Sequence, residues 1–216
     1  MKGVAFMDST DKYLGFVPSN ASGAASLVFD GAWDVSGSAW SFSGGSVAVN
    51  AIVASGLYGS GTVTPKSQFS GGYAVPTPSS PLTPLSMDYS SANALAVAPG
   101  DTTGTWTTTE LTVSIDSSGL LAGALSGPTY GHCALSGTIA PKEPATAKNL
   151  YAMNIALAHS SPGSCSLETA LGQYQGYGAI TFTNVGAAGA PLFARSFTLL
   201  VRTSNHVWFA AELVKQ

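Results

Sequence analysis

Alternation of apolar and polar residues with a period of two recurs along the chain and constrains its fold more than any other feature. Residues 27–35 and 110–116 show it most clearly, because every second position in each run is mostly apolar. Successive side chains of a β-strand point to opposite faces, so this period predicts half-buried strands. The 25 Gly and 12 Pro residues oppose long helices, since both destabilise a helix interior. The sequence therefore predicts an all-β protein.

The predicted strands fall into two groups along the chain. About eight short antiparallel strands fill the C-terminal half. A tight hairpin is expected there at residues 116–119, because Asp116 can accept backbone hydrogen bonds and Gly119 allows a positive φ. In the N-terminal half the strand-like runs are less regular and lie near residues 4–7, 13–17, 40–42, 47–53, 58–64, 69–75 and 85–89.

Two stretches rich in helix-breaking and strand-breaking residues separate the groups. Residues 75–84 contain four prolines and predict a surface loop, because proline cannot donate to a sheet ladder. Residues 91–101 can carry one helical turn. We expect two antiparallel lobes, a small sandwich or open barrel over 1–98 and an up-and-down barrel of about eight strands over 99–216. Such a barrel holds its own side chains or one small ligand, and its bulky inward residues favour a packed interior.

The composition excludes several classes of protein. Only 9% of the residues are charged, and 29 Ser and 20 Thr supply most of the polarity. The 8 Lys and Arg residues are spread along a chain of net charge -3, so no basic surface is expected and nucleic acid is excluded as a partner. The longest apolar stretches are far shorter than the roughly 20 residues of a membrane-spanning helix. A hydrophobic content of 45% excludes a disordered chain.

The compartment is inferred from the N-terminus and the cysteines. The first residues have no apolar core and do not form a signal peptide, so the protein either remains inside the cell or follows a removed leader. The low charge favours export. In an exported chain Cys133 and Cys165 would pair and stabilise the fold by about 3–4 kcal/mol. Two unpaired core thiols are the alternative, and no metal site is predicted, because zinc ligands at short spacing are missing.

The sequence contains no recognisable catalytic motif of the Gly-Xaa-Ser-Xaa-Gly, phosphate-loop, dinucleotide-binding or zinc-protease type. Strand alternation places His132, His159 and His206 in loops or at strand ends. We therefore expect a protein that is not an enzyme and binds no cofactor. A hydrolase that uses one of the serines with His159 or His206 is a third hypothesis.

Arg195 is an unusual residue for its predicted strand. It alternates in phase with four apolar residues, namely Phe193, Phe197, Leu199 and Val201. An isolated buried charge is costly, so Arg195 should form an ion pair, lie at the rim, be turned aside by a β-bulge or contact a ligand anion. The carboxylates expected nearest to it in strand order are Glu110, Asp116 and Glu212.

Aromatic residues form the other candidate contact surface. Trp33 shares the phase of apolar residues and is expected in the core, whereas Trp208 is out of phase and should face outward. The segment 165–177 contains Tyr174 and Tyr177 among Gln and Gly residues, a mixture typical of recognition loops. The same segment could instead cover one end of the barrel.

The order of several short motifs resembles a known group of proteins. These motifs are Gly3-Val4-Ala5-Phe6-Met7-Asp8, Tyr13-Leu14-Gly15-Phe16, Tyr58-Gly59-Ser60-Gly61-Thr62-Val63, Phe69-Ser70-Gly71-Gly72-Tyr73, Met87-Asp88-Tyr89, Thr103-Gly104-Thr105-Trp106 and Cys133-Ala134-Leu135-Ser136-Gly137-Thr138, followed by a second Cys. The group is the uncharacterised secreted or surface lipoproteins of proteobacteria. The resemblance implies an envelope location, in the periplasm, at the outer-membrane surface or secreted. It also implies a lipid anchor upstream of Met1 and a Cys133–Cys165 pair, but it transfers no catalytic residue.

Two hypotheses for function follow from these observations. The first is a non-catalytic envelope or surface protein that binds a protein or glycan partner through its loops, with Arg195, Trp208, Tyr174 and Tyr177 as candidate contacts. The second is a small-ligand carrier that resembles the calycins, in which the C-terminal barrel holds the ligand and Arg195 lies at the pocket.

Overall fold

A computed structural model of the 216-residue chain describes residues 4–8, 10, 12–17, 27–49, 52–74, 82–161, 163–168, 173–187 and 189–216. The chain divides into two compact units, Met1–Ser91 and Ala92–Gln216, whereas the sequence placed the boundary after residue 98. Both units consist of antiparallel strands, which confirms the predicted all-β class. Most of the proline-rich stretch 75–84 lies outside the described residues.

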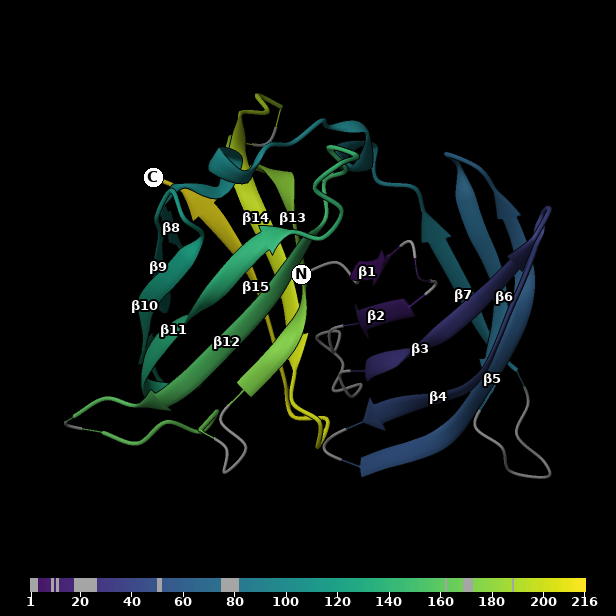
Figure 1. The fold of residues 1–216 in the computed structure, drawn as a ribbon, viewed down its shortest axis with the longest axis horizontal. Helices are drawn as coiled ribbons and strands as arrows, with labels where there is room; N and C mark the ends of the chain where they lie inside the picture. The colour runs from purple at the N-terminus through teal and green to yellow at the C-terminus, as the bar shows by residue number, and fades with distance from the viewer. Residues whose placement is uncertain are drawn as a thin grey trace. The chain divides into compact units, whose positions relative to one another are not determined.

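The first unit is a seven-stranded antiparallel sheet in which every strand pairs with its neighbours in sequence (Figure 1). The predicted strand over residues 47–53 is wrong, because β4 ends at Val49 and β5 begins at Ile52, so the run crosses a connection between strands. The strands are β1 (Val4–Met7), β2 (Lys12–Val17), β3 (Leu27–Ser36), β4 (Ala39–Val49), β5 (Ile52–Thr64), β6 (Gln68–Ala74) and β7 (Thr83–Asp88).

This sheet curls instead of forming the second layer of a sandwich. Phe29 on β3 and Leu85 on β7 line the same apolar hollow, although β4, β5 and β6 lie between these two strands in the sheet. In a flat sheet those strands would be roughly 19 Å apart. The pairing of β4 with β5 shifts register around Gly44, which indicates a β-bulge. Gly44 has a φ of 79°, a conformation that glycine adopts easily, and β-bulges increase the local twist of a sheet. The first lobe is therefore a single curled sheet.

Four aromatic rings form the centre of the first unit. Trp33 is buried, as predicted, and meets the Trp40 ring edge to face at 4.8 Å between centroids and the Phe69 ring at 4.5 Å. The Trp40 ring stacks on Phe42 with an interplanar angle of 6°. Edge-to-face and offset contacts of this kind add about 0.5–1.5 kcal/mol per pair beyond the area they bury. The cluster holds β3, β4 and β6 together.

The Trp40 ring fits against the sheet because glycines lie beside it. The indole Nε1 donates to the carbonyl oxygens of Thr62 and Ser70, at 3.2 and 3.0 Å. A methyl group at Gly61 would lie 2.7 Å from the Trp40 ring and collide with the Ser70 carbonyl oxygen. A methyl group at Gly71 would lie 2.6 Å from the same ring. Glycine is thus required here for space.

Replacing Gly61 by alanine should destabilise the first unit. Overpacking a well-packed site costs about 1–3 kcal/mol, and Gly61→Ala should lower the free energy of unfolding by about that amount. Denaturant unfolding followed by tryptophan fluorescence measures it. Ser60→Ala, at an exposed position of the same strand, is the control and should remain within about 0.5 kcal/mol of the wild type. Equal stability of the two variants would contradict the assignment of Gly61.

The second unit is a closed, eight-stranded, up-and-down barrel, as the sequence predicts (Figure 1). The pairs Val214↔Thr107 and Lys215↔Trp106 join the last strand to the first and close it. No described residues form a helix long and apolar enough to cross a membrane. The strands are β8 (Gly104–Thr107), β9 (Leu111–Ile115), β10 (Leu120–Gly127), β11 (Gly131–Pro141), β12 (Tyr151–His159), β13 (Gln173–Asn184), β14 (Phe193–Arg202) and β15 (Trp208–Lys215).

Inward side chains fill the barrel with one continuous buried cluster. At its centre, Phe197 lies 5.8 Å from the Trp106 ring and 5.9 Å from the Tyr151 ring, measured between centroids. All three side chains are fully buried. Alternation along β9 is regular, with Leu111, Val113 and Ile115 buried and the intervening residues exposed. The interior holds protein side chains, as expected for a barrel of this size.

The two 3₁₀ turns that precede β8 cover one end of this core. These turns are η1 (Ser91–Ala94) and η2 (Pro99–Thr102), and η1 is the helical turn expected from the sequence. Trp106 Nε1 donates to the Thr102 carbonyl oxygen at 2.6 Å, and the Tyr151 hydroxyl donates to the Ala98 carbonyl oxygen at 3.1 Å. These bonds satisfy the polar atoms of two core aromatics, which would otherwise be costly to bury.

Candidate functional site

A disulfide between Cys133 and Cys165 ties the segment before β13 to β11 at the end of the barrel opposite η1 and η2. This confirms the predicted pair, and we call this end the disulfide end. The neighbouring Tyr174 is fully buried, and its hydroxyl donates to the Leu167 carbonyl oxygen at 2.5 Å. Burial raises the pKa of Tyr174 to about 12. Tyr174, a predicted ligand or partner contact, is therefore placed inside the barrel and not on its surface.

Removing the disulfide should destabilise the second unit. The cysteines are 32 residues apart, so opening this loop by Cys133→Ser with Cys165→Ser should cost about 3–4 kcal/mol in the chain-entropy account. Chemical unfolding with and without reductant measures the loss. Intact mass after thiol alkylation of the native protein is the control, and two alkylated thiols in the absence of reductant would contradict the bridge.

Arg195 forms an ion pair at the other end of the barrel. Its Nη2 lies 3.2 Å from the Asp101 Oδ1 atom, and both side chains are partly exposed. The three carboxylates expected from strand order are not this partner. Asp101 belongs to η2 and was missed because it lies 94 residues away, outside the strands. Arg195 thus lies at the rim and is held by a carboxylate of the covering turn.

The Asp101 carboxylate also organises its own turn. Its Oδ2 atom accepts a hydrogen bond from the Ala98 N–H at 2.7 Å. This bond is the main reason that the pKa of Asp101 lies below its ordinary value of 3.8, with smaller contributions from the charges of Arg195 and Lys215. A lowered pKa means that the ionised carboxylate stabilises the folded state.

Asp101→Asn should therefore destabilise the protein in a pH-dependent way. Because the folded pKa is depressed, the contribution of the carboxylate is complete above the ordinary value of 3.8 and is lost as the pH falls through the lower folded value. At neutral pH we expect a loss of about 0.5–1 kcal/mol, typical of a partly exposed ion pair. Unfolding measured from pH 7 downward should show wild type and variant converging in acid. A constant difference would contradict the role of ionisation.

The remaining contact candidates do not share one site. Trp208 pairs with Arg202 at the disulfide end, whereas Arg195 pairs with Phe182 near the opposite end. Tyr177 lies on the outer face of β13, with Lys142 Nζ 5.9 Å from the centroid of its ring. Tyr174 is inside the barrel. The four residues predicted from the sequence therefore cannot contact one ligand together.

The histidines are distributed over the disulfide end. His159 Nδ1 lies 3.1 Å from the Glu168 carboxylate. His132 Nδ1 lies 3.2 Å from the Oγ atom of Ser126, the residue that faces His132 on the neighbouring strand. His206 occupies a turn with a φ of 61°. Among the described residues, no group of three His, Cys, Asp or Glu side chains could hold a metal ion. The contacts of His132 and Ser126 follow from strand register on the exposed barrel wall.

The most unusual surface of the second unit is the hairpin between β13 and β14, which the sequence analysis missed. Four large apolar side chains are exposed there, Phe182 at 51%, Val185 at 51%, Leu192 at 65% and Phe193 at 62%. The described part of this unit has six such side chains, so this one hairpin holds most of them. Concentrated exposed apolar surface is typical of interaction sites. We call residues 182–193 the apolar hairpin.

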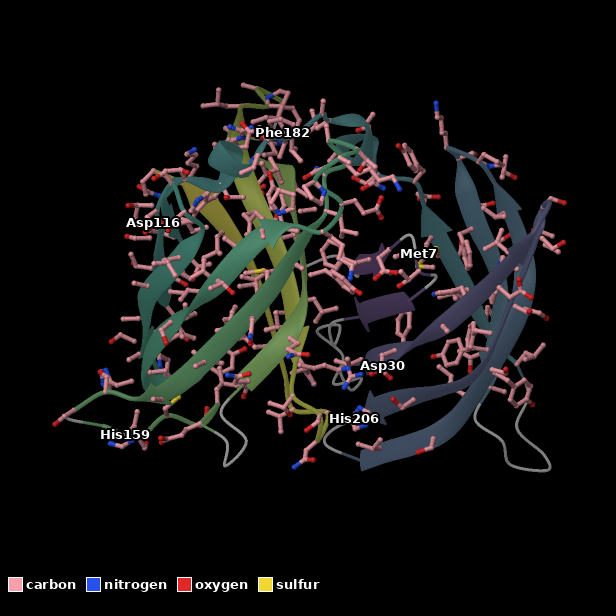
Figure 2. All side chains as sticks on the ribbon, viewed as in Figure 1. Met7, Asp30, Asp116, His159, Phe182 and His206 are labelled. Carbon is pink, nitrogen blue, oxygen red and sulfur yellow. A yellow bond between two sulfur atoms is a disulfide. The ribbon has the colours of Figure 1, made fainter. Side chains whose placement is uncertain are left out.

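The apolar hairpin extends beyond the rim at the end where Arg195 lies, which we call the hairpin end (Figure 1). Figure 2 places Phe182 and His159 at opposite ends of the barrel. Residues 182–194 contain no Asp, Glu, Lys or Arg, but longer uncharged runs such as 35–65 occur in the same chain, so this feature alone does not identify the hairpin. Strand alternation alone did not reveal it, since alternation cannot tell a core strand from one that continues past the core.

Hydrogen bonds within the apolar hairpin fix its tip. The Asn184 Oδ1 atom accepts from the N–H groups of Gly186 and Leu192, at 3.0 and 3.2 Å. The Val185 N–H donates to the Leu192 carbonyl oxygen at 2.7 Å, and the Ala190 N–H donates to the Ala187 carbonyl oxygen at 3.0 Å. The described residues of the tip thus bond to one another and present apolar side chains.

Comparison of the chain with protein-family models, with curated proteins and with solved structures found no match. Function must therefore be inferred from the surface and interior of the protein itself.

Proposed function

We propose that this chain is an exported, non-catalytic binding protein of the bacterial envelope or cell surface that attaches to its partner through the loops at the hairpin end of the barrel. The observation that carries the proposal is the apolar hairpin, in which four large side chains are exposed and the described residues are joined by internal hydrogen bonds. Hot spots of recognition are commonly a few large side chains held on a rigid support.

Three further features support export. Disulfides such as Cys133–Cys165 persist mainly in oxidising compartments, which include the periplasm and the cell exterior. The charge content of 9% and the many hydroxyl groups suit an exported β-protein. The motif order resembles proteobacterial surface lipoproteins, in which a lipid anchor would lie upstream of Met1.

The chemistry of the hairpin limits what it can bind. Its exposed large side chains are hydrocarbon. The side-chain Oδ1 atom of Asn184 already accepts hydrogen bonds within the hairpin. A glycan presents many hydroxyl groups, each of which needs a hydrogen-bonding partner on burial. An apolar surface is therefore a better partner for this hairpin than a sugar chain.

The carrier hypothesis has less support. Trp106, Tyr151 and Phe197 occupy the centre of the barrel and are fully buried. Arg195, the expected pocket residue, is bound to Asp101 at the rim. A small ligand would need to displace these groups, so we place binding at the hairpin.

The proposal predicts that attachment to envelope material depends on the hairpin. Co-sedimentation with isolated proteobacterial envelope fragments, which contain lipid, protein and glycan, should be strong for the wild type. Leu192→Ser with Phe193→Ser should weaken it by about a hundredfold, because each lost apolar contact costs about tenfold or more.

The matched control for this experiment is Val207→Ser, which changes an exposed apolar residue at the disulfide end. It should co-sediment like the wild type. Equal binding by the wild type and the double variant, or no binding by either, would overturn the proposal. Native mass spectrometry of the purified protein tests the carrier hypothesis separately, since a co-purified small molecule would revive it.

A further inference from the structure

We propose that the partner of the apolar hairpin is the hydrocarbon layer of a lipid bilayer, into which the tip inserts while the barrel remains outside. This inference rests on the proposed function and names its partner. Four properties of the hairpin carry it: the absence of charge, apolar side chains on both faces, internally bonded backbone groups and a charged collar at its base.

The first property is that the apolar hairpin contains no charged residue. Residues 182–194 lack all four charged residue types, in a hairpin whose tip is Gly, Ala, Pro, Val and Leu. Charged groups are expensive to bring into hydrocarbon, and their absence removes this barrier to insertion. Longer runs without charged residues, such as 35–65 and 117–141, occur elsewhere in the chain, so it is the exposure of four large apolar side chains in an uncharged run that distinguishes the hairpin.

The second property is that apolar groups project from both faces of the hairpin. Phe182 and Phe193 lie in the phase of the inward residues of β13 and β14, because Phe182 pairs with Arg195 and Phe193 pairs with Asn184. Val185 and Leu192 directly follow the last pair, Asn184↔Phe193, and the Val185 N–H donates to the Leu192 carbonyl oxygen, so continued alternation directs their side chains to the other face. A groove on a protein would cover one face, whereas hydrocarbon surrounds both.

The third property concerns the backbone. A peptide group that enters hydrocarbon without a hydrogen bond costs several kcal/mol. The N–H groups of Val185, Gly186, Ala190 and Leu192 all donate within the hairpin, two of them to the Asn184 side chain. Pro191 has no N–H to satisfy. These groups can therefore leave water without losing hydrogen bonds to it.

The fourth property is a charged collar at the base of the hairpin. Arg195 pairs with Phe182 across the strands and bonds Asp101, and Lys215 is close enough to contribute to the lowered pKa of Asp101. Glu212 also lies here, because the Thr183 hydroxyl donates to its Oε1 atom, so two cations and two anions follow the apolar tip. This order, an apolar tip and then a charged collar, matches a bilayer in which hydrocarbon lies behind polar head groups.

Insertion can be tested with a fluorophore at the tip. The described cysteines are both in the disulfide, so Ala190→Cys adds a single reactive thiol at an exposed site. Labelled with an environment-sensitive dye and mixed with phosphatidylcholine vesicles, this variant should show a blue shift and quenching by brominated acyl chains. The same label on Ser161→Cys, exposed near the disulfide end, should show neither change.

The second readout is flotation of the unlabelled protein with the same vesicles. Leu192→Ser with Phe193→Ser should reduce the bound fraction about a hundredfold, at roughly tenfold for each large side chain. Val207→Ser should float like the wild type. Because hydrocarbon contact dominates, binding should persist at high salt, in contrast to purely electrostatic attachment.

The outcomes separate this inference from the proposed function. No flotation and no blue shift, together with hairpin-dependent binding to envelope fragments, would overturn the lipid partner and assign a protein partner to the same hairpin. If the wild type binds neither the vesicles nor the envelope fragments, both proposals are overturned. Equal flotation of the wild type and the double serine variant would also reject insertion of this hairpin.

Discussion

Closure of the ladder between β15 and β8 is the constraint on which the rest of the second unit depends. The pairs Val214↔Thr107 and Lys215↔Trp106 leave this barrel no free edge, so each strand must place one set of side chains inside and the other outside. The inside set is then buried around Trp106 and Phe197. Because η2 ends two residues before β8 begins, the position of β8 also fixes the position of η2. Asp101 of η2 is thereby placed next to Arg195.

Closure also accounts for the apolar hairpin. β13 pairs with β14 over ten residue pairs, from Gln175↔Arg202 to Asn184↔Phe193, whereas β8 contributes only two pairs to β15. A long strand pair beside a short one extends past the common rim. Side chains that share the inward phase, such as Phe182 and Phe193, therefore have no core to enter and become exposed.

Much of the fold was predictable from local patterns. Residues 110–116 alternate regularly, and the turn at 116–119 has the expected chemistry, since Asp116 Oδ1 accepts from Ser118 and Leu120 while Gly119 has a φ of 82°. The disulfide followed from the cysteine count and expected export. The end of β4 and start of β5 were not predictable by alternation, because Asn50 is the only polar residue in the run 47–53 that crosses the connection.

The site was harder to predict because it depends on contacts distant in sequence. Strand order could not pair Arg195 with Asp101, which lies in a 3₁₀ turn. Tyr174 resembled a recognition residue by composition, yet the beginning of β13 turns it into the barrel. The uncharged run 182–194 was visible, but only the length of the strand pair shows that it leaves the core.

The lack of charge in the apolar hairpin also bears on how the protein is degraded. Trypsin-like proteases cut after Lys or Arg, and no such residue lies between Lys148 and Arg195. Exposed loop tips are ordinarily the preferred points of proteolytic nicking. The part of the second unit with the most exposed apolar surface is therefore inaccessible to this class of protease by composition alone.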